Sequence, residues 1–256
     1  MMRSGLKTIM ENIKLQLIPN NTRIVDYCIC LGYTYALISI DEKKYLGLSH
    51  TFINHLSRRK PGINSIEELR LPDVLLSRDP YARQLGFALL NAYSQYLISR
   101  DGHVDLGRDV DAVDAVEIGR NERVLFIGDI RPLVERVRER AGEVVVLEND
   151  VCRRPDTLPG TYLSLLGDFD VVFITGAALV NGSLDQILML TRSARERVLV
   201  GPTAQIYPGF LRGTGLTKVA GCYVLDPGAV IRGLKIGYGT RWVLRYSRKY
   251  VLDVPS

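Results

Sequence analysis

The sequence predicts an α/β fold in which a smaller α+β domain, residues 1–118, precedes a doubly wound parallel-sheet domain, residues 119–256. After residue 122, short runs of Val, Ile, Leu and Phe alternate with helical patterns, which is typical of a parallel sheet covered on both faces. In the first domain, β-rich runs come before the longer helical patterns. Hydrophobic residues form 46% of the 256-residue chain, and this excludes intrinsic disorder.

The first 50 residues are expected to form one helix and three strands. Residues 6–17 have a loose helical period. The β-rich runs 23–30 and 33–40 flank Gly32, which predicts a hairpin, and residues 45–48 make the third strand.

Two further helices are expected before residue 101. The segment 58–64 contains a Pro-Gly pair and is typical of a loop. Ser65 and Glu68 have the spacing of a capping box, in which Ser65 caps a helix and Glu68 reaches back to its start. Pro80 suits the first position of the second helix, residues 81–99.

The C-terminal half is expected to alternate strands and helices. Its strands are predicted at residues 123–127, 143–147, 170–174, 197–200 and 216–219. Its helices are predicted at residues 132–141, 183–192 and 207–212. In a doubly wound sheet, ligands bind outside the carboxyl ends of the strands. The candidate site residues are therefore those after the strands: Gly128 and Asp129, Glu148 to Asp150, Thr175 to Ala178, and Gly201 to Thr203.

Charge and cysteine usage narrow the class of protein. The chain has 33 Lys and Arg residues and 28 Asp and Glu residues, so it is mildly basic. The basic residues do not form a long run, so nucleic acid is not expected as the main partner. Four cysteines without a C-x-x-C pair favour a reducing cytoplasm. No apolar run approaches 18 residues, so neither a membrane span nor a membrane partner is expected. A homodimer is the expected assembly, because two-fold dimers are the commonest oligomers of soluble proteins.

The first strand–helix turn of the C-terminal half begins at Gly128. It lacks the second and third glycines of a dinucleotide fingerprint, and Asp129 would repel a pyrophosphate, so NAD is disfavoured. Glu148 lies 20 residues after Gly128, where an acid would hold a ribose hydroxyl. This pair fits an adenosine-like ligand, a methyl-donor cofactor or a metal. Alternatively, Glu148 caps a turn or pairs with an arginine.

Two loops after the later strands could donate backbone N–H groups to an anion. Residues 175–182 read T-G-A-A-L-V-N-G, and small residues there let a ligand approach the backbone before the next helix. Asn181 could bind a ligand or its own backbone, and Ser183 could simply cap the helix. Residues 201–203 follow the next strand in the same way.

Few residue spacings point to a metal. Cys28 and Cys30 share one face of a strand and are expected to be packing residues. His50 and His55 lack the i, i+4 spacing of two ligands on one helix. No Ser/His/Asp or Cys/His nucleophile pattern is present. The acids expected together at the rim of the sheet, where oxygen ligation is plausible, are Asp129, Glu148 and Asp150.

Several segments, taken in order, resemble a known family. They are Glu148 with Pro155 and Pro159, residues 170–184, residues 201–204, Tyr207-Pro208, Gly215, Ala220-Gly221, Asp226 and, nearer the N-terminus, residues 86–92. Over nearly the whole chain the sequence is similar to an uncharacterised prokaryotic family described as “putative heavy-metal chelation” proteins.

The resemblance implies a Rossmann-like C-terminal domain, an enolase-N-terminal-like domain before it, and a ligand cleft between them. It also implies handling of a metal or metal chelate, with a divalent ion as the candidate cofactor. Carried over by position, the ligand-binding residues are Glu148, Thr175, Gly176, Asn181, Gly201, Pro202 and Thr203, with Ser49, His50, Thr51 and Asn91 from the N-terminal domain.

These observations predict a cytoplasmic two-domain protein that binds a small anionic or metal-chelating ligand between its domains. Glu148, with His50 or Asp150, would hold a cation or a ligand hydroxyl, and Gly128 would adjoin it. The alternative is a transferase that uses an adenosine-containing cofactor such as S-adenosylmethionine at Gly128 and Glu148. A third possibility is a regulatory module that binds nucleic acid through its net charge of +5.

Overall fold

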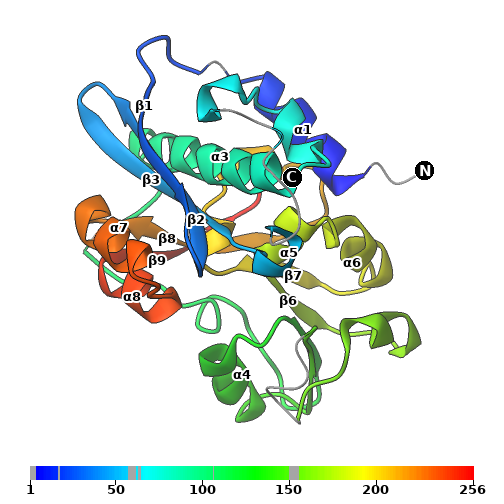
Figure 1. The fold of residues 1–256 in the computed structure, drawn as a ribbon. Coiled ribbons are helices and arrows are strands. Elements are labelled where there is room, and N and C mark those ends of the chain that lie inside the picture. Colours follow the sequence, from blue (N-terminus) through cyan, green and yellow to red (C-terminus); the bar gives the residue numbers. More distant parts are fainter. Residues whose placement is uncertain (1–3, 17, 57–61, 63–64, 106, 150–155) are drawn as a thin grey trace.

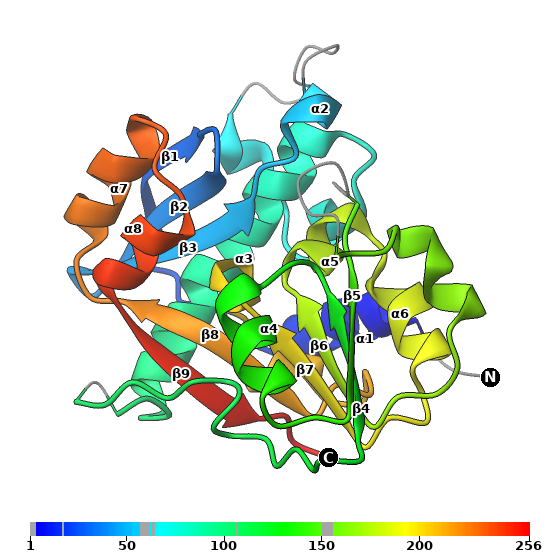
Figure 2. The same ribbon diagram turned by 90° about the horizontal axis from the view of Figure 1, so that it is seen from below.

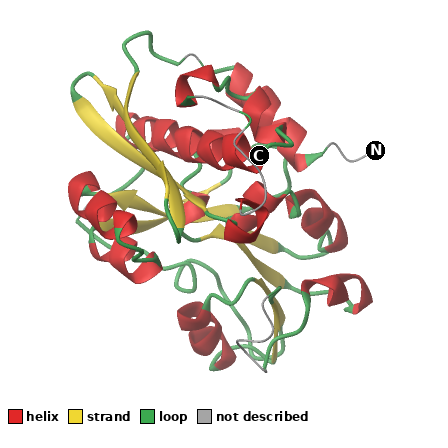
Figure 3. Ribbon diagram, viewed as in Figure 1, coloured by secondary structure: helices red, strands yellow, loops and turns green. Residues whose placement is uncertain are grey.

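The computed structural model of the protein describes residues 4–16, 18–56, 62, 65–105, 107–149 and 156–256. Its strands form two separate sheets, a three-stranded antiparallel sheet and a six-stranded, mostly parallel sheet (Figure 1). Helices pack around and between the two sheets (Figure 3). The predicted α/β class, with a small α+β part and a Rossmann-like part, is confirmed.

The small sheet forms where the sequence predicted a hairpin and a third strand. Its members, in the order β1-β2-β3, are β1 (Arg23–Ile29), β2 (Tyr33–Ile40) and β3 (Lys43–His50). In the β2–β3 register Tyr33 stands opposite His50, and Ala36 stands opposite Gly47. Alternate residues of β2 and β3 therefore face either the long helix or the C-terminal helices.

The long helix α3 (Pro80–Arg100) lies between the small sheet and the large sheet. Asp79 caps it by accepting a hydrogen bond from the N–H of Tyr81, and Pro80 occupies its first turn, as predicted. Fourteen of its 21 residues are buried, on nearly every side, because it has sheet neighbours on both flanks. At the closest approach, a Cβ added to Gly47 would lie 2.0 Å from the backbone nitrogen of Ala92.

The large sheet has the order β5-β4-β6-β7-β8-β9. Its strands are β4 (Arg123–Ile127), β5 (Glu143–Leu147), β6 (Val171–Thr175), β7 (Glu196–Val200), β8 (Lys218–Val224) and β9 (Ser247–Asp253). The first five strands in this order are parallel, and β9 is antiparallel to β8. The chain changes direction across the sheet at β4, between β5 and β6, which makes this edge the topological switch point.

Helices cover both faces of the large sheet, which explains why its strands are so apolar. Val124 and Phe126 pack with α4 (Arg131–Arg138), whereas Leu125 belongs to the core on the other face. Figure 2 shows α4 in front of the sheet and α1 (Gly5–Lys14) behind it. The remaining helices are α2 (Ile53–Leu56), α5 (Ala177–Asn181), α6 (Leu184–Leu190), α7 (Pro227–Lys235) and α8 (Thr240–Arg245).

Although α1 comes first in the sequence, it packs on the C-terminal half. The hydroxyl of Ser4 and the N–H of Leu6 both donate hydrogen bonds to the carboxylate of Asp185. The amide of Asn12 donates to the carbonyls of Phe210 and Arg212, at 3.0 and 2.9 Å. The division at residue 118 stays a prediction, and these contacts place one N-terminal helix against the larger sheet.

On the free edge of β3, two backbone groups of Leu48 are satisfied by side chains instead of by another strand. The N–H of Leu48 donates to Oε1 of Gln205 at 2.8 Å, and the carbonyl of Leu48 accepts from Nδ2 of Asn91 at 2.7 Å. Gln205 also donates to the carbonyl of Cys222, and Asn91 also donates to that of Thr203. These two amides fasten β3 to the turn after β7 and to β8, and they protect an edge that would otherwise be unpaired.

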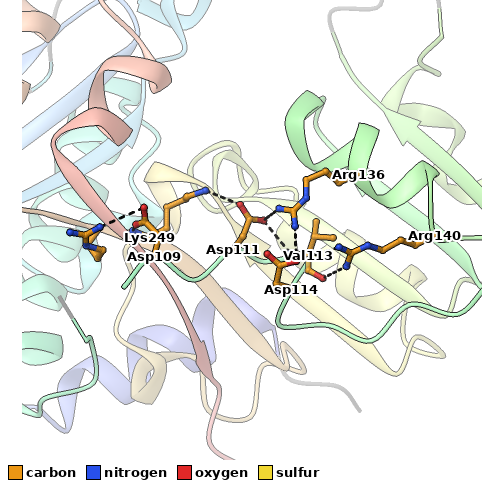
Figure 4. A network of polar contacts seen from close by, with 8 residues as sticks. Asp109, Asp111, Val113, Asp114, Arg136, Arg140 and Lys249 are labelled. Carbon is orange, nitrogen blue, oxygen red and sulfur yellow. Dashed lines mark hydrogen bonds and ion pairs between the residues drawn. The ribbon is translucent and has the colours of Figure 1, made fainter. Parts of the chain in front are cut away.

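Residues 109–114, which lie between the two halves of the chain, are held in place by charged groups (Figure 4). Asp111 accepts a hydrogen bond from Nζ of Lys249 at 2.8 Å and forms an ion pair with Arg136 at 3.1 Å. Arg136 also pairs with Asp114 at 2.6 Å, and the N–H of Lys249 donates to Asp109. The carboxylate of Asp111 thus connects β9 to α4.

Some local predictions were wrong. Ser65 makes no capping hydrogen bond, and residues 66–68 form only a single 3-10 turn, because the chain becomes extended at Leu69. Residues 208–211 are likewise a 3-10 turn within the predicted helix 207–212. The loop expected at residues 175–182 contains α5, and the elements α7, α8 and β9 were not predicted.

Within the described part of the chain, no helix has the length and hydrophobicity needed to cross a bilayer.

Candidate functional site

The residues predicted to follow the strands of the large sheet do meet at one edge. Gly128, Glu148, Thr175 and Gly201 directly follow or end β4, β5, β6 and β7, which are parallel neighbours. A Cβ added to Gly128, whose φ is +96°, would lie 3.0 Å from the side chain of Thr175. A side chain at position 128 would therefore be strained and would crowd the switch point. With His50, these four residues are called the edge site below.

Glu148 is oriented by the backbone around it. One carboxylate oxygen accepts the N–H of Asp129 at 3.0 Å and the other accepts the N–H of Asn149 at 2.7 Å. The N–H of Gly128 donates to the carbonyl of Leu147 at 2.8 Å, so the first and second strand–helix turns are joined. The half-buried carboxylate is thereby held at the switch point, 20 residues after Gly128, as expected.

The other predicted acids of this rim have different surroundings. Asp129 pairs with Arg131 at 3.1 Å, and Arg131 also pairs with Asp156 at 2.7 Å. The negative charge of Asp129 is therefore already balanced by the guanidinium of Arg131. Asp150 lies outside the described residues. Among the residues that the structure describes, no three His, Cys, Asp or Glu side chains cluster in a way that could hold a metal.

His50 ends β3 and approaches this edge from the small sheet. Its ring makes edge-to-face contacts with Phe52, at 4.8 Å between centroids, and with Tyr33, at 6.2 Å. Burial lowers the pKa of His50 below its ordinary value, while the negative charge of Glu148 raises it in part. An imidazole held neutral near pH 7 keeps a lone pair for a metal or a hydrogen-bond donor. The structure thus brings His50 within electrostatic range of Glu148.

The lowered pKa of His50 predicts a pH dependence of stability in the metal-free protein. The unfolded chain takes up a proton at His50 near pH 6.5, before the folded chain does, so the free energy of unfolding should fall as the pH falls from 7.5 to 5.5. His50→Gln should flatten that slope. Urea unfolding of EDTA-treated protein at several pH values measures it. His103→Gln is the control, since His103 is 40% exposed, and an equal loss of slope in both variants would contradict the prediction.

Three residues predicted to bind ligand, Ser49, Thr51 and Asn91, are buried in the joint between the small and large sheets. Asn91 and Ser49 are fully buried, and Thr51 is 5% exposed. The hydroxyl of Thr51 bonds to that of Thr34 at 3.0 Å, and Asn91 is committed to two backbone carbonyls. The hydroxyl of Thr51 and the amide N–H groups of Asn91 therefore connect elements of the fold. The buried hydroxyl of Ser49 and Oδ1 of Asn91 have no hydrogen-bond partner among the described residues.

The turns after β6 and β7 pack against each other. A Cβ added to Gly176 would lie 2.6 Å from the backbone nitrogen of Ala204, so glycine permits this approach. Pro202 and Thr203 are buried in the turn of residues 202–204. Gly201 differs, because a Cβ there would meet nothing within 4 Å, although its φ of +109° is strained for other residues. The space into which a side chain at position 201 would point is therefore open.

Asn181 faces a cavity of about 310 Å³. Its described lining residues, here called the Arg83 cavity, are Phe52, Ser77, Arg78, Pro80, Arg83, Gln84, Val180 and Asn181. Phe52 belongs to this lining and also contacts the ring of His50, so the cavity adjoins the edge site. Arg78, Arg83 and Gln84 were not among the predicted site residues. Nothing in the sequence distinguished them from ordinary residues at the start of a helix.

Cys28 of β1 and Cys30, just after that strand, lie together, as their spacing predicted. Their sulfur atoms are 2.7 Å apart, and Cys30 is buried in the core beneath the C-terminal helices. Burial raises the pKa of Cys30 to about 12. Such a thiol is poorly suited to act as a thiolate at neutral pH.

Comparison with known proteins finds similar proteins over most of the chain. Two family models match, over residues 111–253 and 11–94, and both are described as “Putative heavy-metal chelation”. An uncharacterized protein of Methanocaldococcus jannaschii is 30% identical over 249 residues, covering 91% of this chain and 90% of that protein. A crystal structure of a protein with unknown function from Pyrococcus horikoshii has a TM-score of 0.82 at 29% identity and covers 99% of this chain and 100% of its own. Another, from Desulfitobacterium hafniense, has a TM-score of 0.79 at 19% identity, covers 98% of each chain and shares the fold.

Proposed function

Because the chain belongs to the family described as “Putative heavy-metal chelation”, we propose that it binds a metal ion, or a small anionic molecule that chelates one, at the edge site. The observation that carries the proposal is the electrostatic interaction between His50 and Glu148, which come from different sheets. Imidazole nitrogen suits borderline divalent ions such as zinc and nickel, and a carboxylate oxygen can serve beside it, as it does in zinc sites.

Two protein ligands do not complete the coordination of such an ion. The remaining positions would be taken by donor atoms of the chelating molecule or by water. The open space beside Gly201 leaves room for that molecule, and the turns at Gly128 and Thr175 present little side-chain bulk. Glu148 is held by two backbone N–H groups, so it can meet a cation without first being ordered.

Glu148→Gln and His50→Ala should each lower the affinity for Co²⁺ or Ni²⁺ by at least about 10-fold, because each removes one of the two ligands. The measurement is isothermal titration calorimetry on protein stripped with EDTA and returned to metal-free buffer. Glu135→Gln is the matched control, since Glu135 is an exposed carboxylate on α4. Circular dichroism would confirm that every variant is folded.

Equal metal affinity in wild type, Glu148→Gln and His50→Ala would exclude these two residues as ligands. The alternative function, a transferase with an adenosine-containing cofactor, would use Gly128 and Glu148 without a metal. It predicts that S-adenosylmethionine raises the melting temperature. At 100 times its Kd, the ligand should add about 2.7 kcal/mol to the free energy of unfolding. A shift abolished by Glu148→Gln would favour that alternative.

A further inference from the structure

The described walls of the Arg83 cavity come from both halves of the chain. Ser77 and Arg78 precede α3, and Arg83 lies in its first turns. Phe52 follows β3, and Asn181 ends α5 of the C-terminal half. The volume of about 310 Å³ is at the lower end of the range for small-molecule sites.

The charge of this lining is one-sided. Two of its eight described residues are arginines, and none of the eight is acidic. A lining with two cations and no carboxylate among its described residues favours an anionic occupant, because the field of the guanidinium groups is strengthened where water is partly excluded.

Arg83 is the cation of this cavity that most needs a partner. Its Nε donates to the carbonyl of Leu75 at 3.3 Å, and it forms no ion pair with any acid among the described residues. Burial lowers the pKa of Arg83 below its ordinary value, which reports the cost of holding this charge away from water. A bound anion would offset that cost, and a guanidinium fork suits carboxylate and phosphate oxygens.

Two amide side chains of the lining, Asn181 and Gln84, are held by local hydrogen bonds. Oδ1 of Asn181 accepts from the N–H and the hydroxyl of Ser183, so the amide donors of Asn181 are oriented by that turn. Gln84 is used on both sides, by the N–H of Phe52 and the carbonyl of Pro80, so it builds the wall.

Gly182 keeps space for the guanidinium. Its φ is +80°, and a Cβ there would lie 2.9 Å from an Nη atom of Arg83. A larger residue at position 182 would therefore both strain the backbone and displace the guanidinium.

We propose that the Arg83 cavity is an anion-binding site that takes a carboxylate or phosphate group, with Arg83 as the principal contact and Arg78 and Asn181 as further donors. The cavity adjoins His50 through Phe52, so one molecule with several carboxylates could bind Arg83 and share a metal with the edge site. That last step, which makes the ligand a polycarboxylate chelator, rests on the proposed function. The anion site itself stands on the cavity and its charge.

The test is calorimetric titration of metal-free protein with two probes, citrate and inorganic phosphate. Arg83→Met should lower the affinity for the anion that binds wild type by at least about 10-fold, and Arg83→Lys should lose less because it keeps the charge without the fork. Arg120→Met removes an exposed arginine elsewhere and should bind as wild type does. Without ligand, Arg83→Met should unfold at the same temperature as wild type or higher, since it removes a half-buried charge.

Unchanged affinity in Arg83→Met, or no saturable binding of either probe by wild type at up to about 10 mM, would overturn the anion site. Glu148→Gln separates the two proposals. If it loses Co²⁺ but keeps citrate, both sites stand. If citrate binding depends on Arg83 while no variant affects Co²⁺, the anion site stands and the proposed metal site fails. Stronger citrate binding in the presence of Co²⁺, lost in Glu148→Gln, would support one shared ligand.

Discussion

Gly47→Ala should prevent the chain from folding, with a loss of more than about 4 kcal/mol in the free energy of unfolding. The added Cβ would lie 2.0 Å from the nitrogen of Ala92 and 2.1 Å from the carbonyl oxygen of Ala88. Both atoms belong to the backbone of α3, so no side-chain rotation relieves the clash. The small sheet and α3 would have to separate, and the core between them would open.

Soluble yield and urea unfolding measure this effect. Gly228→Ala is the matched control, because a Cβ there would meet only side-chain atoms, at 3.4 Å, in the exposed first turn of α7. Alanine favours a helix over glycine, so this variant should be as stable as wild type or more stable by up to about 1 kcal/mol. A Gly47→Ala protein with wild-type stability would show that the sheet and the helix do not approach so closely.

Asn91→Leu should cost about 3–5 kcal/mol of stability. The two side chains have the same number of heavy atoms and the same branching, but leucine offers no hydrogen bond to the carbonyls of Leu48 and Thr203, which Asn91 now satisfies at 2.7 and 2.9 Å. Two buried carbonyls would be left without partners at the joint between the sheets. Thermal and chemical unfolding measure the loss.

The same variant distinguishes the two roles considered for Asn91. If it is structural, as its contacts indicate, folded Asn91→Leu protein should bind Co²⁺ and citrate with the affinity of wild type. If it contacts ligand, affinity should fall with little change in stability. Asn121→Leu, at an exposed loop position, is the control and should change neither stability nor binding.

The sequence predicts the five parallel strands of the large sheet because each of them carries its own signal, whereas β9 was not predicted. Val124, Leu125 and Phe126 are consecutive apolar residues, and such a run is stable only with cover on both faces. Once the strands were known to be parallel, Gly128, Glu148, Thr175 and Gly201 had to share an edge. That part of the edge site follows from chain order alone.

Other features depend on contacts between residues far apart in the chain. Asn91 is an ordinary polar residue on a helix until Leu48 and Thr203 come within reach. Arg83 becomes unusual only because α5 and the turn at Gly182 enclose it. Ser65 illustrates the opposite error, since its capping-box spacing was present but the chain turned away after one turn. Local sequence patterns predict secondary structure, whereas the role of a side chain depends on which distant residues the tertiary fold brings to it.

The packing of α3 has a consequence for the order in which the protein can fold during synthesis. When the first 100 residues have left the ribosome, Asn91, Gln95 and Leu48 still lack their partners in the C-terminal half, because Thr203, Gln205 and Val224 have not been made. The same holds for α1, whose partner Asp185 comes 181 residues after Ser4. Until β7 and β8 are complete, the nascent chain exposes one flank of its longest apolar helix. During that interval, the N-terminal half is a natural client for chaperones that shield apolar surface.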